Sequence, residues 1–277
     1  MKNITQEERL DYLVDAFKAD SDEYKDLQVS ENPDEKRRIL RSLMNIRIPK
    51  DMNLEVLEVQ DEYLSERSVE KGIVRLEYIS TVAEQGGKSS FADKISIWQG
   101  DITRLSVDAI VNAANSQMLG CFVPMHTCID NCIHTYAGIQ MRAECHRQMN
   151  KLRIKYGRDY GQPTAVPMLT LGYNLPAKNV IHIVGPIVRG RLTKELENDL
   201  ADCYRNTLDM CLKNGLKSVA FCCISTGVFH FPNKRAAEIA VGTVTDWLNS
   251  HEGAMDRVIF NVFKDEDKEY YEQLLLF

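Results

Sequence analysis

The chain has 277 residues, of which 44% are hydrophobic and 27% are charged, and its formal net charge is −6 at pH 7. These values are ordinary for a globular protein, and no apolar run approaches the roughly 20 residues that span a bilayer, so we expect no membrane association. The acidic balance argues against a general nucleic-acid-binding surface. The amino-terminal segment lacks the apolar core of a secretory signal, so we expect a cytoplasmic protein.

Residues 1–90 are predicted to form a mainly helical extension. Thr5 and Glu8 have the spacing of a capping box, and apolar residues follow at helical intervals. A second helix is indicated by Asn32-Pro33, an N-cap followed by proline at the first helical position. Residues 53–79 have mixed apolar spacing that is compatible with a further helix. The polar, glycine-containing segment 85–90 suggests a hinge, and we place a domain boundary there.

Residues 91–277 alternate short β-branched runs with helical patterns, which is typical of an α/β sandwich. Helices are predicted near residues 130–150, 195–214 and 232–249 and at the carboxyl terminus. The predicted strands are Ile95–Trp98, Ala109–Asn112, Ala165–Thr170, Val180–Val184, Ser218–Cys223 and Arg257–Val262.

The strongest local motif is a Cys-x4-His-x-Cys arrangement formed by Cys121, His126 and Cys128. Thiolate and imidazole ligands suit zinc, and three protein ligands leave a fourth tetrahedral position open, as in catalytic zinc sites. Buried cysteines beside a chance histidine are the alternative, and the spacing alone does not decide between the two. Without a secretory signal, eight cysteines favour reduced thiols or metal ligands over a disulfide framework.

Three further segments follow predicted strands and could bind a polyphosphate ligand. The small residues 225–228 precede Pro232, a predicted helix start, so backbone N–H groups could approach an anion; an ordinary strand-to-helix turn is the alternative. Asp101 could accept a hydrogen bond from an adenine amino group or could simply cap a helix. Asn112 and Asn115 could reach sugar hydroxyls, although asparagine at a turn is usually structural.

Five motifs in order, GDIT, VDAIVNAAN, IDNCIHTYAG, GYNLPAKNVIHIVGP and ISTGVFHFP, resemble the macrodomain family of ADP-ribose binders and hydrolases. The resemblance covers about residues 93–277 and implies a three-layer α/β/α sandwich around a mixed sheet. Where the common hydrolytic members have a glycine-rich stretch, this chain has the Cys121–Cys128 cluster. That substitution resembles the zinc-containing branch, which is linked in microbes to sirtuin-type ADP-ribosyltransferases, and it implies one zinc ion per chain.

The resemblance also implies roles for individual residues. Asp101, with Ile102 beside it, matches the position that recognises adenine. Asn115 matches the asparagine that orients the distal ribose, while Asn112 is interpreted as a brace for the loop, and Asp130 matches the position that helps to activate water. The diphosphate loop corresponds to Ser225, Thr226, Gly227 and Val228, the aromatic near the distal ribose to Phe229, and His230 stands where the family has glycine.

The resulting hypothesis is zinc-dependent hydrolysis of mono-ADP-ribose from acidic side chains, with Asn115 and Asp130 as the catalytic residues. Two alternatives remain: a deacetylase of O-acetyl-ADP-ribose, and a non-catalytic reader of ADP-ribosylated proteins. The expected partner is ADP-ribose or an ADP-ribosylated protein, and branch membership suggests a lipoylated carrier protein. The extension is expected to pack on the core, with partner binding as the alternative. His134 is interpreted as a satisfied core histidine, and Cys222 and Cys223 as buried strand residues.

Overall fold

The computed structural model describes residues 4–277, which are built around a six-stranded sheet. The strand order is β2-β8-β7-β4-β6-β5; β5 is antiparallel to β6, and the other neighbours are parallel. The sheet is therefore mixed, as predicted. Its strands are β2 (Ile95–Gln99), β4 (Ala109–Ala114), β5 (Met168–Leu171), β6 (Asn179–Val184), β7 (Ser218–Phe221) and β8 (Arg257–Val262).

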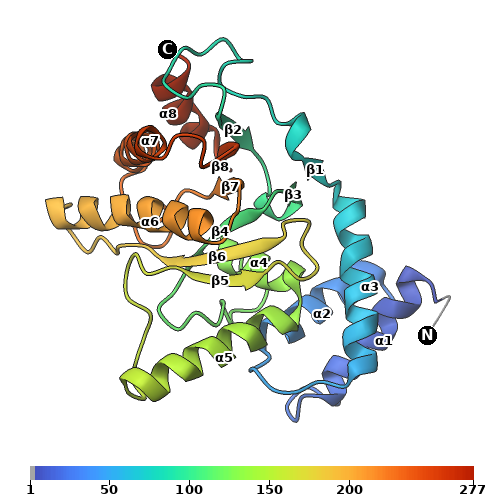
Figure 1. Cartoon of the computed structure of the whole chain (residues 1–277). Helices are drawn as coiled ribbons and strands as arrows, with labels where there is room; N and C mark the ends of the chain where they lie inside the picture. The colour runs from blue at the N-terminus through green and yellow to red at the C-terminus, as the bar shows by residue number, and fades with distance from the viewer. Residues whose placement is uncertain (1–3) are drawn as a thin grey trace.

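Helices cover both faces of this sheet, with α4 and α5 on one face and α6 and α7 on the other (Figure 1). This arrangement confirms the three-layer sandwich. Because both faces are covered, the central strands read as nearly continuous apolar runs. The helices are α4 (Ile129–Ala137), α5 (Ile139–Tyr156), α6 (Lys194–Lys213), α7 (Asn233–Ser250) and α8 (Asp265–Leu275).

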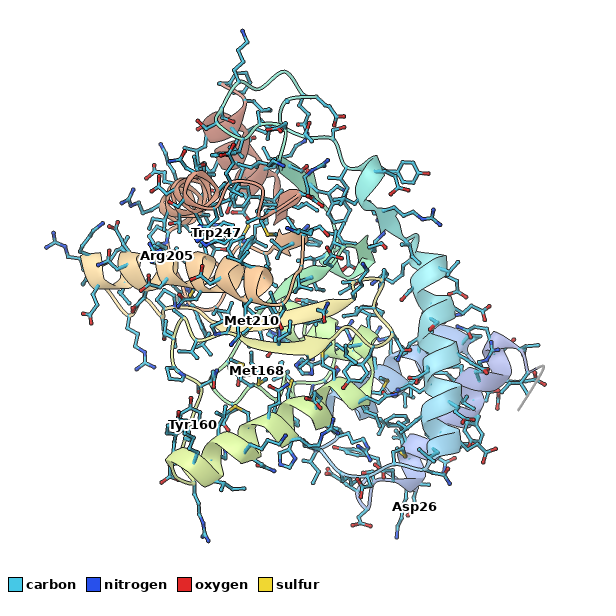
Figure 2. All side chains as sticks on the ribbon, in the orientation of Figure 1. Asp26, Tyr160, Met168, Arg205, Met210 and Trp247 are labelled. Carbon is cyan, nitrogen blue, oxygen red and sulfur yellow. The ribbon has the colours of Figure 1, made fainter. Side chains whose placement is uncertain are left out.

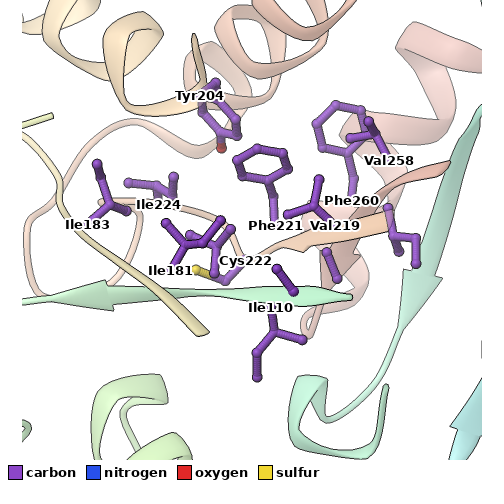
Figure 3. Close-up of a cluster of buried hydrophobic side chains, with 14 of the residues drawn as sticks. Ile110, Ile181, Ile183, Tyr204, Val219, Phe221, Cys222, Ile224, Val258 and Phe260 are labelled. Atoms are coloured by element: carbon purple, nitrogen blue, oxygen red, sulfur yellow. The ribbon is translucent and has the colours of Figure 1, made fainter. Parts of the chain in front are cut away.

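The core between the sheet and its helices is filled by large side chains from both layers (Figure 2). On the α6–α7 face, Phe221 of β7 lies under Tyr204 of α6, with their ring centroids 4.9 Å apart. The ring centroids of Phe260 of β8 and Tyr271 of α8 are 4.8 Å apart. Figure 3 shows Tyr204, Phe221 and Phe260 in this cluster. This packing fixes the carboxyl ends of the parallel strands, from which the candidate site is built.

The amino-terminal helices α1 (Gln6–Ala19), α2 (Pro33–Ile46) and α3 (Leu54–Lys71) form a second, smaller core. Thr5 completes a capping box with Glu8, and Asn32 caps α2 ahead of Pro33, as the sequence predicts. Ile139, at the start of α5, belongs to this second core, so the extension packs directly on the sandwich.

A short connection joins the two cores. After α3 the chain forms β1 (Val74–Arg75), which pairs in parallel with β3 (Leu105–Ser106), and the 3₁₀ turn η1 (Leu76–Tyr78). Ile79 and Val82 are buried in the larger core. The division at residue 90 stays a prediction. Within residues 4–277, no helix is long and apolar enough to cross a bilayer.

Two predicted elements differ in detail from the structure. The single helix expected near residues 130–150 is two helices, because Gly138 has φ +95° and an added Cβ there would lie 2.7 Å from the Gln60 amide nitrogen. The strand expected from Ala165 begins only at Met168. Ala165 has φ +61°, outside the β region, and Pro167 cannot donate a ladder hydrogen bond.

Candidate active site

The predicted metal ligands converge in the β4–α4 loop (residues 115–128). The ligand atoms of Cys121, His126 and Cys128 lie within 4.8 Å of one another, and Cys121 Sγ is 3.5 Å from His126 Nδ1. Tetrahedral zinc with ordinary Zn–S and Zn–N bonds places such a pair about 3.5 Å apart. The donor set therefore fits zinc in both chemistry and spacing.

Local backbone geometry brings these ligands together. Gly120 has φ +79° and lies against the His134 ring, where an added Cβ would come within 2.8 Å of ring carbons. Cys128 is the N-cap of α4, and its Sγ accepts a hydrogen bond from the Asn131 N–H at 3.4 Å. Burial, assisted by the neighbouring Cys121, raises the pKa of the Cys128 thiol to about 12. A bound cation favours the thiolate over the thiol, so metal binding would release protons.

Helix α2 of the extension holds the outer side of this loop. Arg41 donates to the His126 carbonyl at 2.7 Å and to Asn131 Oδ1 at 2.9 Å. Asn45 is buried, and its Oδ1 accepts the Met125 N–H at 3.1 Å. The segment that carries the ligands is therefore fixed by two side chains that lie about 80 to 90 positions earlier in the chain.

The buried Arg142 of α5 joins α2 to the same loop. Its Nη1 donates to the carbonyls of Met44, Asn45 and Arg47, which end α2. Its guanidinium carbon lies 4.3 Å from the centre of the Phe122 ring. Burial lowers the pKa of Arg142 to about 10, so the side chain stays charged at neutral pH. A cation at this helix end is favourable because the last carbonyls are unpaired within the helix.

Asp130, the second residue of α4, follows the candidate ligand Cys128 by two positions and is only 5% exposed. Its Oδ1 accepts from Asn112 Nδ2 at 2.8 Å, and its Oδ2 accepts from Asn115 Nδ2 at 3.3 Å. Asn115 Nδ2 also reaches the Gly120 carbonyl at 3.2 Å. Burial raises the pKa of Asp130 to about 6. A carboxylate with a pKa just below neutrality can accept a proton.

A hydrogen-bond relay supports Asp130 from inside the domain. Asn112 Nδ2 lies 3.0 Å from His182 Nδ1, and His182 Nε2 lies 3.0 Å from Thr170 Oγ1. Since the amide can only donate, His182 Nδ1 is the acceptor and Nε2 carries the proton. Burial lowers the pKa of His182 to about 3, so the ring is neutral. Asn112 thus braces Asp130, and sequence reasoning missed His182 because its partners lie on other strands.

His134, Cys145 and His182 form a second close cluster, entirely buried. Nε2 of His182 carries a proton, and the lone pair of Nδ1 accepts a hydrogen bond, so neither ring nitrogen is free to bind a metal. We therefore interpret this cluster as part of the hydrogen-bond relay and not as a metal site. The interpretation of His134 as a satisfied core histidine is half wrong. The ring is buried, but neither nitrogen has a hydrogen-bond partner within residues 4–277.

Asp101 follows the edge strand β2, and both of its carboxylate oxygens have partners within the protein. Its Oδ1 accepts from the Thr103 amide at 3.0 Å, and its Oδ2 pairs with Lys71 Nζ of α3 at 2.7 Å. Partial burial raises the pKa of this carboxyl, but Lys71 and Thr103 outweigh it, so the pKa lies below its usual value. Ile102 is buried in the adjoining 3₁₀ turn η2 (Ile102–Arg104).

The β7–α7 loop (residues 222–232) is shaped by its backbone. Ser225 is buried with φ +65°, and His230 has φ +57°, a conformation that glycine adopts readily. The Phe231 amide donates to the Ser225 carbonyl and the His230 amide to the Gly227 carbonyl, both at 3.0 Å. In the described chain, the amides of three consecutive residues donate to no protein acceptor; they are Gly227, Val228 and Phe229.

Topology places these pieces along one edge of the sheet. Strands β2, β8, β7 and β4 are parallel neighbours, so their carboxyl ends lie together (Figure 1). Asp101, the β7–α7 loop and the β4–α4 loop follow three of these ends. The carboxyl edge of parallel strands is where open α/β sheets bind ligands. One hydrogen bond joins Asn115 to Asp130, whereas none joins the two loops to each other among residues 4–277.

Comparison with known proteins gives a consistent result. A family model described as the macro domain matches residues 111–240. A protein-ADP-ribose hydrolase of Treponema medium is 44% identical over 98% of this chain and 100% of its own length, and one of Staphylococcus aureus strain MRSA252 is 40% identical over 96% and 94%. The crystal structure of a Trypanosoma brucei macrodomain with ADP-ribose is 32% identical, covers 84% of this chain and 94% of its own, and has a TM-score of 0.62.

Proposed function

Because the chain belongs to the macro domain family, we propose that it is a zinc-dependent hydrolase that releases mono-ADP-ribose from the acidic side chains of modified proteins. The observation that carries this proposal is the convergence of Cys121, His126 and Cys128 in the loop that also holds Asn115 against Asp130. A pure reader of ADP-ribose has no evident need for three metal ligands beside a buried carboxylate with a raised pKa. This combination is typical of catalytic sites.

The residues at the carboxyl ends of the parallel strands are proposed to bind the parts of ADP-ribose. The free amides of Gly227 and Val228 and the start of α7 would hold the diphosphate, with Ser225 and Thr226 shaping the loop and Phe229 packing near the distal ribose. Asp101 and the neighbouring Ile102 would recognise adenine. Since both Asp101 oxygens already accept hydrogen bonds, adenine would share an oxygen with Thr103 or Lys71.

The proposed chemistry assigns a separate task to each group. When bound by its three ligands, zinc would supply Lewis-acid polarisation. Asn115 orients the distal ribose, and Asp130 takes a proton from the attacking water while the hydroxyl adds to the carbonyl carbon of the ester. The bond between that carbon and the ribose oxygen then breaks, and the ribose oxygen is the leaving oxygen. The proton then returns to the leaving oxygen, which restores Asp130. The amides of Asn112 and Asn115 fix the carboxylate, so that little reorganisation is needed during the step.

A release assay combined with metal analysis tests this proposal. Purified protein, before and after chelation, would be given matched peptides that carry ADP-ribose on glutamate, aspartate, serine or arginine, and O-acetyl-ADP-ribose as a small ester. We expect zinc-dependent release from the glutamate and aspartate linkages only. Full activity in verified metal-free protein would rule out the zinc role, and exclusive turnover of O-acetyl-ADP-ribose would make the chain a deacetylase. Tight ADP-ribose binding without any turnover would make it a reader.

The modified protein itself is proposed from the family branch. A lipoylated carrier protein modified by a sirtuin-like transferase is the candidate substrate. The test compares release from the modified carrier with release from an unrelated protein that carries the same glutamate linkage. Equal rates on both would remove the carrier from consideration.

A further inference from the structure

A cavity of about 180 Å³ opens between α2 and α3 of the extension, and its wall is rich in arginine. Arg37, Arg38 and Arg41 line it from α2, and Arg67 lines it from α3. None of the residues that line the cavity is an aspartate or a glutamate. We name these four side chains the arginine pocket. In a chain whose net charge is −6, this is a local concentration of positive charge.

Only two of the four arginines in the arginine pocket form ion pairs with acidic side chains, and those acidic side chains do not line the cavity. Arg37 pairs with Asp34 and Arg67 pairs with Glu70, both exposed contacts within one helix turn. Such surface pairs are weak, about 0.3–0.5 kcal/mol, so they give way to a better acceptor. Arg38 is exposed and forms no ion pair within residues 4–277.

Arg41 connects the pocket to the metal ligands. It donates only to neutral groups, a carbonyl, an amide oxygen and a thiol sulfur, and its Nε is buried without a partner in the described chain. Met125, which lies between two of the predicted metal ligands, forms part of the cavity wall. The pocket and the β4–α4 loop therefore share a wall, and a polypeptide bound at the metal side would pass close to the arginines.

We propose that the arginine pocket binds an acidic segment of the ADP-ribosylated protein, next to the modified side chain. This inference rests on the proposed hydrolase function. The guanidinium fork matches a carboxylate in a bidentate way, and a buried donor without a partner gains most from a charged acceptor. The half-buried Tyr136 and the buried Tyr63 line the same cavity and offer apolar surface to the peptide. The pocket would thereby give protein substrates a lower KM than free ADP-ribose esters.

The experiment compares charge reversals inside and outside the pocket. The test variant is Arg38→Glu with Arg67→Glu, which leaves Arg41 and the metal ligands untouched. The matched control is Lys151→Glu with Lys155→Glu, which makes the same change in charge near the end of α5, away from α2 and α3 (Figure 1). Substrates are a peptide with glutamate-linked ADP-ribose flanked by aspartates and the same peptide with the flanking aspartates changed to asparagine.

We expect the KM of the test variant for the acidic peptide to be about tenfold higher than that of wild type, because the variant loses roughly one good ion pair with the peptide. Its kcat should be unchanged. For the asparagine peptide, wild type and variant should have the same KM, and the control should behave as wild type on both. Added salt should narrow the difference between the two peptides for wild type. Equal KM values of wild type for both peptides would overturn the proposal, as would a variant that weakens free ADP-ribose binding to the same extent.

Binding of the unmodified acidic peptide, measured by fluorescence anisotropy, separates this inference from the proposed function. If wild type releases no ADP-ribose yet binds the acidic peptide and the test variant does not, the hydrolase proposal fails and the pocket stands. If release is normal but peptide binding is unchanged by the reversals, the pocket proposal fails alone. Binding of an RNA oligonucleotide with higher affinity than the acidic peptide would also overturn it.

Discussion

The β4–α4 loop and the β7–α7 loop both follow parallel strands, yet they are held in shape by different forces. The first depends on buried or half-buried side chains that reach it from other elements: Arg41 and Asn45 from α2, and Arg142 from α5. The second depends on its own backbone, with Ser225 in the left-handed region and internal hydrogen bonds around it. The first loop should therefore be most sensitive to changes in side-chain identity. The second loop should be most sensitive to substitutions that crowd its backbone.

This difference suits the proposed tasks. Metal ligands and a general base need fixed side-chain positions, which several neighbouring side chains can enforce together. A diphosphate is bound by backbone N–H groups, which require a particular backbone shape and few side chains. Each loop can then be disturbed without the other, and five substitutions test that independence.

The largest effect is expected from Cys128→Ser. Serine keeps the cap of α4, but its hydroxyl is a poor zinc ligand, so bound metal and ADP-ribose release should both be lost, the latter by about 10³-fold or more. Binding of free ADP-ribose should persist, because the β7–α7 loop is intact. Metal analysis, the release assay and calorimetry measure the three quantities. Cys132→Ser, one turn further along α4, is the control and should keep its metal. A fully active, metal-loaded Cys128→Ser variant would contradict the prediction.

The second-largest effect is expected from Asp130→Asn. It keeps the shape of the buried side chain but removes the group that accepts a proton, so kcat should fall by about 10²–10⁴-fold. Zinc content and ADP-ribose affinity should stay near wild type, since no metal ligand changes. Steady-state kinetics with metal analysis measures this. Unchanged kcat would show that another base serves the reaction, and loss of zinc together with kcat would show that Asp130 acts only by ordering the loop.

The sequence predicted the pieces of the site that are local in the chain. The three candidate metal ligands lie within eight residues. The resemblance implied roles for Asn115 and Asp130 beside them, and the structure joins these two by a hydrogen bond. The major strands were also predictable, because β-branched runs between turn residues carry a clear signal. The two-residue strands β1 and β3 were not, since two residues carry no periodicity.

Contacts between distant segments could not be predicted. Arg41 reads as one of several charges on an amphipathic helix, and only folding brings it to the His126 carbonyl. His182 reads as one polar residue in an apolar strand, and its relay role depends on β4 and β5 as neighbours. Side-chain hydrogen bonds over 70 or more positions leave no local pattern, so the support of the β4–α4 loop was invisible in the sequence.

Gly185→Ala tests the second loop from outside it, because Gly185 follows β6 and lies against Ser225. An added Cβ would lie 2.1 Å from Ser225 Oγ and 2.8 Å from Ile224 Cγ2, so these two side chains of the β7–α7 loop must move, or the loop must shift with them. We expect ADP-ribose to bind at least about tenfold more weakly, the cost of one or two lost anion contacts, while zinc content is unchanged. Calorimetry and metal analysis measure this. Gly242→Ala, within α7 and outside the loop, is the control, since nothing lies within 4 Å of its added Cβ. Equal ADP-ribose affinity of Gly185→Ala and wild type would contradict the backbone argument.

Arg41→Met should have a smaller effect confined to the first loop. Methionine keeps the apolar stem but loses the donors to the His126 carbonyl and to Asn131. Groups that orient metal ligands typically change metal affinity by about 10–100-fold, and we expect the lower end because Asn45 still holds Met125. Competition with a chromogenic chelator measures zinc affinity without any substrate. Arg38→Met, on the exposed side of α2, is the control, and equal zinc affinity in all three proteins would show that α2 does not support the site.

The smallest effect concerns pH and the relay behind the first loop. Burial lowers the pKa of His182 to about 3, whereas the unfolded chain should titrate near 6.5. Between these values the unfolded state binds a proton that the folded state does not, so stability falls as pH drops below 6.5, by about 1.4 kcal/mol per pH unit for one such group. The raised pKa of Asp130 acts in the opposite sense between about pH 4 and 6, so the informative quantity is a difference between variants.

His182→Asn should therefore flatten the dependence of unfolding free energy on pH below 6.5 by about one proton, relative to wild type. Urea unfolding at pH 5 and pH 7 gives this slope, and His146→Asn, outside the relay, is the control. Amide hydrogen exchange at pH 5 then connects the result to the two loops. Because the relay supports Asp130 and, within residues 4–277, forms no side-chain hydrogen bond to the β7–α7 loop, acid should reduce protection first around α4. Equal loss of protection in both loops would show that they are not independent.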